Sequence, residues 1–101
     1  MAKASKSQLL ELIQLRDFVI EVMMSMGVWS EEELTKLTDI KLGVLKKNAT
    51  QRHGVTRWKR GVRKPTMPEE VEVIDIHPRL LSDEWIPYGA WVMHHEFVHA
   101  L

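Results

Sequence analysis

Apolar residues recur at three- and four-residue spacing between residues 7 and 27, and this spacing predicts an amphipathic helix that ends at Gly27. Glycine often stands just past a helix, because it adopts the left-handed conformation without strain. We also interpret Met24, within this helix, as a packing residue. The predicted buried stripe consists of Leu9, Leu12, Ile13, Leu15, Phe18, Val19, Val22, Met23 and Met26.

A second helix is predicted to begin after Ser30, whose hydroxyl can cap the open amides while Glu33 reaches back to the Ser30 amide. Val28 and Trp29 leave only a tight connection, so we expect the two helices to fold back as a hairpin. Gly43, near the end of the predicted second helix, has a low helix propensity and would weaken that helix. Its apolar stripe runs through Leu34, Leu37, Ile40, Leu42 and Leu45.

Two extended segments follow, at residues 55–59 and 71–77, and both are rich in β-branched or aromatic residues. Gly61, Pro65 and Pro68 mark a loop between them. The pattern therefore predicts a β-hairpin with a long loop.

Pro78 holds the preceding residue extended and ends the second strand. Pro87 suits the first turn of a helix, and nothing after it breaks a helix up to residue 101. The order of helices, strands and a last helix predicts an α+β fold. The length of 101 residues suits one domain, spanning 1–101.

The amino-acid composition limits the kinds of metal site and catalysis that the chain can support. The chain has no cysteine, which excludes disulfides, cysteine zinc fingers and thiol catalysis, so a zinc ion would need His and carboxylate ligands. Lys and Arg (14) balance Asp and Glu (14), so the net charge indicates no partner. We find no signal-peptide pattern and no apolar run of about 18 residues, so we expect a cytoplasmic protein without membrane contact.

The last predicted helix contains the sequence HEFVH at residues 95–99. His95 and His99 are four residues apart, so both imidazoles can reach one Zn²⁺ ion. Glu96 lies about 100° further round the helix, where it can accept a proton from water on the metal. This pattern predicts a zinc peptidase, and the alternative is a helix on which two histidines align by coincidence. His94 points away from the pair and is interpreted as a packing or supporting residue.

With this motif, the segments VEVIDIHPRLL and WVMHHEFVHAL resemble the SprT-like metalloprotease family, to which Spartan belongs, over residues 48–101. The resemblance implies a zincin-like fold with an N-terminal helical part on a small sheet and a C-terminal HExxH helix. It also implies an endopeptidase acting on proteins associated with or crosslinked to DNA. His95 and His99 would bind the zinc, and Glu96 would be the base.

The family's third ligand is a histidine downstream of the motif, and it has no counterpart up to residue 101. We therefore expect an incomplete SprT-like domain, inactive if no other ligand completes the site. His53, Asp75 and His77 are the alternative third ligands.

The segment 46–64 carries eight cations, and no Asp or Glu occurs between residues 42 and 67. Such a segment is typical of a phosphate-binding surface with an aromatic platform, which predicts contact with DNA and association with the nucleoid. The alternative is a solvated hairpin whose cations balance acidic clusters, with Trp58 in the core. The candidate DNA-binding residues are Arg52, Arg57, Trp58, Lys59 and Arg60.

Two other functions stay open: a nucleic-acid-binding module with a vestigial metal site, and an interaction domain that uses the N-terminal helices. Trp29, Trp85 and Trp91 are expected in the core, and Tyr88 is expected to face the metal cleft. By analogy with zincins, a peptide substrate is expected to add alongside the strand at residues 71–77.

Overall fold

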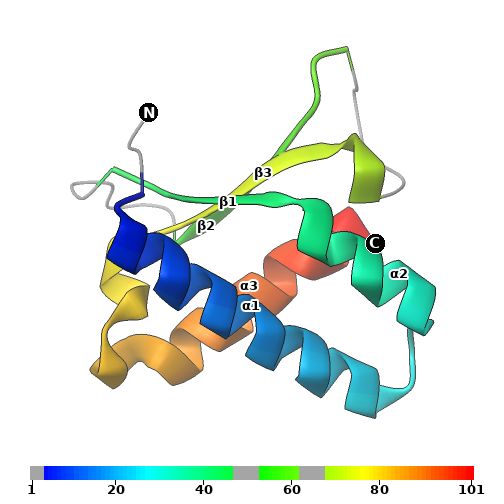
Figure 1. Cartoon of the computed structure of the whole chain (residues 1–101), viewed down its shortest axis with the longest axis horizontal. Coiled ribbons are helices and arrows are strands. Elements are labelled where there is room, and N and C mark those ends of the chain that lie inside the picture. The colour runs from blue at the N-terminus through cyan, green and yellow to red at the C-terminus, as the bar shows by residue number, and fades with distance from the viewer. Residues whose placement is uncertain (1–3, 47–52, 62–67) are drawn as a thin grey trace.

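Two long helices pack against one face of a small mixed sheet (Figure 1). The computed structural model describes residues 4–46, 53–61 and 68–101. The principal elements are α1 (Lys6–Met26), α2 (Glu31–Lys36), β1 (Lys41–Val44), β2 (Gly54–Trp58), β3 (Val71–Ile76) and α3 (Ile86–Ala100). The predicted α+β class is confirmed.

Helix α1 has the predicted extent. It begins after Ser5, whose hydroxyl accepts a hydrogen bond from the Gln8 amide, and it ends at Gly27, which is left-handed. The predicted buried stripe was wrong at four positions, because Leu9, Phe18, Val22 and Met26 are exposed, and Met24, interpreted as a packing residue, is exposed as well. Apolar residues occur on more sides of this helix than the sheet and α3 cover. The side chains that it buries are Leu12, Leu15, Val19, Ile20 and Met23.

Helix α2 begins as predicted but is much shorter than predicted. The Ser30 hydroxyl accepts from the Glu33 amide at 3.1 Å, and the Glu33 carboxylate accepts from the Ser30 amide at 3.0 Å. A 3₁₀ turn, Leu37–Asp39, follows, and the chain then becomes extended as β1. The prediction of a helix through Leu42 and Leu45 was wrong, because pairing with β3 fixes this segment as a strand.

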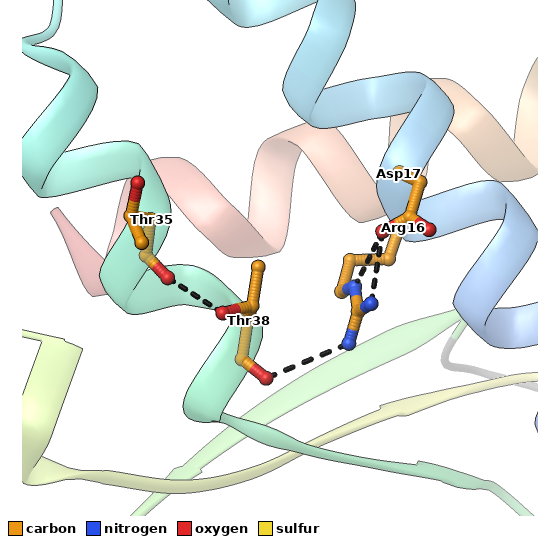
Figure 2. Close-up of polar contacts among 4 residues, drawn as sticks. All are labelled: Arg16, Asp17, Thr35 and Thr38. Atoms are coloured by element: carbon orange, nitrogen blue, oxygen red, sulfur yellow. Dashed lines mark hydrogen bonds and ion pairs between the residues drawn. The ribbon is translucent and has the colours of Figure 1, made fainter.

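Polar side chains join α1 to the turn that follows α2 (Figure 2). The Arg16 guanidinium donates to the Asp17 carboxylate at 2.9 and 3.0 Å and to the Thr38 carbonyl at 3.5 Å. The Thr38 hydroxyl in turn donates to the Thr35 carbonyl at 2.7 Å. Exposed pairs of this kind stabilise a fold only slightly, so packing sets the position of α2.

The sheet has the strand order β1-β3-β2. Strand β2 pairs antiparallel with β3, which confirms the predicted hairpin, and β1 pairs parallel with the other side of β3. Residues directly opposite each other share a face, so Thr56 and Leu42 lie on the same face as Ile74. This face meets α1 and α3, and the core there contains the fully buried Ile74, Ile76, Leu12, Met93 and Phe97.

The opposite face of the sheet carries an ion pair. The Asp75 carboxylate is 3% exposed and accepts from the Arg57 guanidinium, its neighbour on β2. Gly43 of β1 is the register partner of Asp75, and a Cβ at Gly43 would overlap Asp75 Oδ1. A side chain at position 43 would therefore displace the carboxylate.

None of the described helices has the length and apolar character needed to cross a lipid bilayer.

Candidate metal centre

Helix α3 brings His95 and His99 together on its exposed side. Their Nε2 atoms lie 3.0 Å apart, and the rings meet edge to face with centroids 4.6 Å apart. The four-residue spacing places the two side chains one turn apart on the same side of the helix, as predicted.

Glu96 lies next to the pair, on the side of α3 that meets β2, and is only 6% exposed. The Thr56 hydroxyl donates to Glu96 Oε1 at 2.8 Å and also lies 3.4 Å from the Glu96 carbonyl oxygen. A carboxylate that accepts a hydrogen bond inside the protein is held in one orientation. Thr56 is thus a site residue that the sequence analysis missed.

Gly54 permits the close contact between β2 and α3. A Cβ at this position would stand 2.8 Å from Val92 Cγ1 and 3.2 Å from Glu96 Cγ. Glycine inside a strand often marks a place where another part of the chain comes close. Thr56 is two residues further along β2 and lies on the same face as Gly54. Gly54 was therefore the one signal in the sequence for the contact between Thr56 and Glu96.

The three residues of the motif form a group that could hold a metal ion. One ligand atom from each of His95, Glu96 and His99 lies within 4.8 Å of the other two. In the described part of the chain, this is the only group of three or more His, Asp or Glu side chains with such an arrangement.

The alternative third ligands lie elsewhere. Asp75 points to the opposite face of the sheet, where it pairs with Arg57. The Nδ1 atom of His77 accepts from the Arg79 amide and caps a 3₁₀ turn. The ring of His53 packs edge-on against Tyr88. None of the three joins His95 and His99, so these assignments were wrong for the described structure.

A row of aromatic rings leads along α3 to the histidine pair. Trp91 stacks on Tyr88 with an interplanar angle of 16°, and on His95 with an interplanar angle of 23°. Trp91 is 60% exposed, and Trp85 and Tyr88 are also exposed, so the expectation that Trp85 and Trp91 anchor the core was wrong. Tyr88 lies on the same side of α3 as His95, with Trp91 between them.

His94 and Trp29 pack together on another side of α3. Their rings meet edge to face with centroids 6.1 Å apart, and Trp29 packs partly buried against the core. His94 also lines a hollow between α1 and α3, together with Val19 and Val22. This agrees with its interpretation as a packing residue outside the histidine pair.

The sheet edge beside the site is β2, not β3. The expected strand at residues 71–77 is central and paired on both sides, so it cannot receive another strand. The His53 carbonyl accepts from the His77 amide, and hydrogen-bonded pairs alternate along an antiparallel ladder. The backbone polar groups of Gly54 and Thr56 therefore point away from β3.

The predicted DNA-binding residues have different surroundings. Arg57 forms an ion pair with Asp75. Trp58, Lys59 and Arg60 are exposed, so Trp58 is not in the core. Arg52 lies outside the described residues.

One acidic cluster does receive cations. Lys36 binds the Glu69 carboxylate at 2.9 Å and lowers its pKa, and Lys59 lowers it further. Lys36 lies outside the segment 46–64, so Lys59 is the cation of that segment that acts on this acidic cluster, as the alternative interpretation expects.

No family model, curated protein or solved structure matched this chain in our comparisons.

Proposed function

We propose that this chain is the metal-binding and catalytic part of a zinc-dependent endopeptidase of the SprT-like kind, with DNA-associated proteins as its substrates. The observation that carries the proposal is the pairing of His95 Nε2 and His99 Nε2, 3.0 Å apart, beside the oriented carboxylate of Glu96. The resemblance of residues 48–101 to that family adds the substrate class and the zincin-like fold.

The ligand spacing suits zinc. Two nitrogens bound to one zinc ion at about 2.0–2.1 Å in tetrahedral geometry lie roughly 3.4 Å apart. The His95 and His99 Nε2 atoms are 3.0 Å apart, so the two rings need to move apart only slightly to bind a zinc ion. Both imidazoles are exposed, so the ion and a water molecule can reach them from solvent.

The chemistry assigned to the chain centres on Glu96. Zinc at such a site acidifies water and polarises a substrate carbonyl. Glu96 then takes the proton from the attacking water and passes it to the leaving amine, which is the work of a general acid and base. The hydrogen bond from the Thr56 hydroxyl holds Oε1, so the second carboxylate oxygen is the one that accepts the proton.

The substrate has a place beside the edge strand β2. The backbone groups of Gly54 and Thr56 point away from β3 and can pair with an extended peptide. A peptide in this position runs close to Glu96, because Thr56 contacts Glu96 directly.

Catalytic zinc usually has three protein ligands and one open position. Two imidazoles with a nearby carboxylate bind the ion weakly, so the proposal includes one more ligand from outside the group of His95, Glu96 and His99.

Metal analysis of the purified full chain tests the proposal. His95→Ala is expected to lose zinc, and the matched variant His94→Ala is expected to retain it, because His94 lies outside the pair. Equal zinc in the wild type and His95→Ala would contradict the proposed metal site.

Glu96→Gln tests the proposed base. It should keep the metal and reduce peptide cleavage by roughly 10²- to 10⁴-fold. Full activity in this variant would rule out Glu96 as the base.

A nucleic-acid-binding role is the second candidate, and the exposure of Trp58 beside Lys59 and Arg60 favours it. This role predicts DNA binding that weakens with salt and does not change when a chelator removes metal. The double variant Lys59→Ala, Arg60→Ala should weaken such binding, while Glu96→Gln should not.

A further inference from the structure

The rings of Tyr88, Trp91 and His95 form a stack along the exposed side of α3. The Trp91 ring centroid lies 5.9 Å from each of the other two, with interplanar angles of 16° to Tyr88 and 23° to His95. Nearly parallel rings with centroids about 4.5–7 Å apart have the offset stacking that aromatic pairs prefer. Spacings of three and four residues bring these side chains to one side of the helix. The stack therefore ends on one of the two candidate histidine ligands.

Trp91 is not held in place by the protein core. Its side chain is 60% exposed, more than that of any other tryptophan in the chain. A substitution at this position therefore removes little core packing. Its effects report mainly on the contact between the indole and the neighbouring rings.

The His95 ring lacks the support that a metal-binding histidine usually has. Such a histidine normally donates its second ring N–H to a carboxylate, a carbonyl or a water molecule, and this bond fixes the orientation of the ring. Among the residues that the structure describes, the His95 ring has one hydrogen-bonding contact, between its Nε2 and that of His99. The contact left to fix the plane of the His95 ring is the stack on Trp91.

Stacking on Trp91 favours metal binding for two reasons. An exposed imidazole that samples several rotamers loses this freedom when it binds an ion, so a contact that orients the ring beforehand lowers the entropic cost. An imidazole that binds Zn²⁺ also shares its positive charge. The negative face of an indole attracts a cation placed over it, and tryptophan does so more strongly than tyrosine or phenylalanine.

We propose that Trp91 is a positioning residue of the metal centre, which orients the His95 imidazole through stacking and thereby strengthens zinc binding. This inference rests on the proposed zinc site, and it adds to that site a residue from outside the sequence HEFVH.

Zinc affinity of the full chain tests this role. The wild type and its variants are titrated with zinc in competition with a chromophoric chelator. Trp91→Leu keeps an apolar side chain at the hollow between α1 and α3 but has no ring, and it should bind zinc about five- to tenfold more weakly. Trp91→Phe keeps an aromatic ring and should recover most of this loss.

Trp85→Leu is the matched control. Trp85 is an exposed aromatic residue just before α3, and its ring contacts Tyr88 rather than His95. This variant should bind zinc as tightly as the wild type.

NMR of the metal-free chain measures the orientation of the ring directly. The ring current of Trp91 should shift the ring-proton resonances of His95 in the wild type. Trp91→Leu should move these resonances toward those of a freely exposed histidine, whereas Trp85→Leu should not. Circular dichroism confirms that each variant is folded, so that a loss of zinc binding is not a loss of structure.

The outcomes separate this inference from the proposed function. Equal zinc affinity in the wild type and Trp91→Leu, or His95 resonances that do not change, would overturn the role of Trp91 and leave the proposed zinc site intact. An equal loss of affinity in Trp85→Leu would also overturn it, because the effect would then belong to the whole aromatic row. A wild-type chain that binds no zinc would overturn the zinc site and the positioning role together.

Discussion

The Thr56 hydroxyl donates a 2.8 Å hydrogen bond to Glu96 Oε1, and so joins the edge strand to the helix that carries the candidate metal ligands. Thr56→Val keeps the shape of the side chain and removes the donor. If Glu96 is the base of the proposed peptidase, kcat is expected to fall about tenfold with little change in KM, because poor orientation of the carboxylate would slow the chemical step.

Thr56→Ser is the control for this prediction, since it restores the hydroxyl and should restore most of kcat. Zinc content should be unchanged in both variants. A loss of activity in Thr56→Ser, together with full activity in Thr56→Val, would show that packing of the methyl group, not the hydrogen bond, matters.

Gly54→Ala should destabilise the protein by about 1–3 kcal/mol, because the added methyl group overlaps Val92 and Glu96. Urea denaturation measures this change. Val55→Ala is the control, because Val55 points to the opposite face of the sheet and does not pack on α3. A neutral effect of Gly54→Ala would mean that β2 does not pack closely on α3.

Arg57→Met should lower the free energy of unfolding by up to about 3 kcal/mol, since it leaves the buried Asp75 carboxylate without its partner. The double variant Arg57→Met, Asp75→Val removes both charges and should recover part of this loss. If the two single changes add without coupling in a double-mutant cycle, the ion pair contributes nothing.

The start of α2 should weaken in acid. The Ser30 amide, followed by the Ser30 hydroxyl, lowers the pKa of Glu33 below its usual value. A carboxyl with a lowered pKa stabilises the fold above its unfolded pKa, and this contribution is lost as the pH falls through the folded pKa. The Ser30 amide resonance, followed by NMR, should report that loss at acid pH.

Glu33→Gln separates the charge from the hydrogen bond. Its amide oxygen can still accept from the Ser30 amide, so the cap should persist without pH dependence. Glu31→Gln should leave the titration as it is in the wild type. An unchanged acid transition in Glu33→Gln would assign the effect to another group.

Features encoded by local sequence were predictable. The start of α2 follows from Ser30 and Glu33, and the histidine pair follows from a four-residue spacing on a helix, so both were found before the structure. Strand β1 was missed because its partner is β3, about thirty residues later, and a short segment with Leu42 and Val44 fits a helix equally well.

Tertiary packing determined the features that local sequence could not predict. Helix α1 has apolar residues on several sides, so periodicity could not show that Phe18 and Val22 would stay exposed. Trp91 was predicted to lie in the core because tryptophan side chains are on average mostly buried, but it is exposed. The bond from Thr56 to Glu96 joins residues 40 positions apart, and only the fold brings them together.

The central place of β3 in the sheet governs the order in which the protein can assemble. Both earlier strands pair only with β3 in the described sheet, so they wait for it during synthesis. Strand β3 ends 32 residues after β1, so at about 5–20 residues per second the wait after β1 leaves the ribosome is roughly two to six seconds. During that interval two unpaired strand segments are open to chaperones or to misassociation, and the candidate metal group on α3, residues 95–99, is synthesised only after β3.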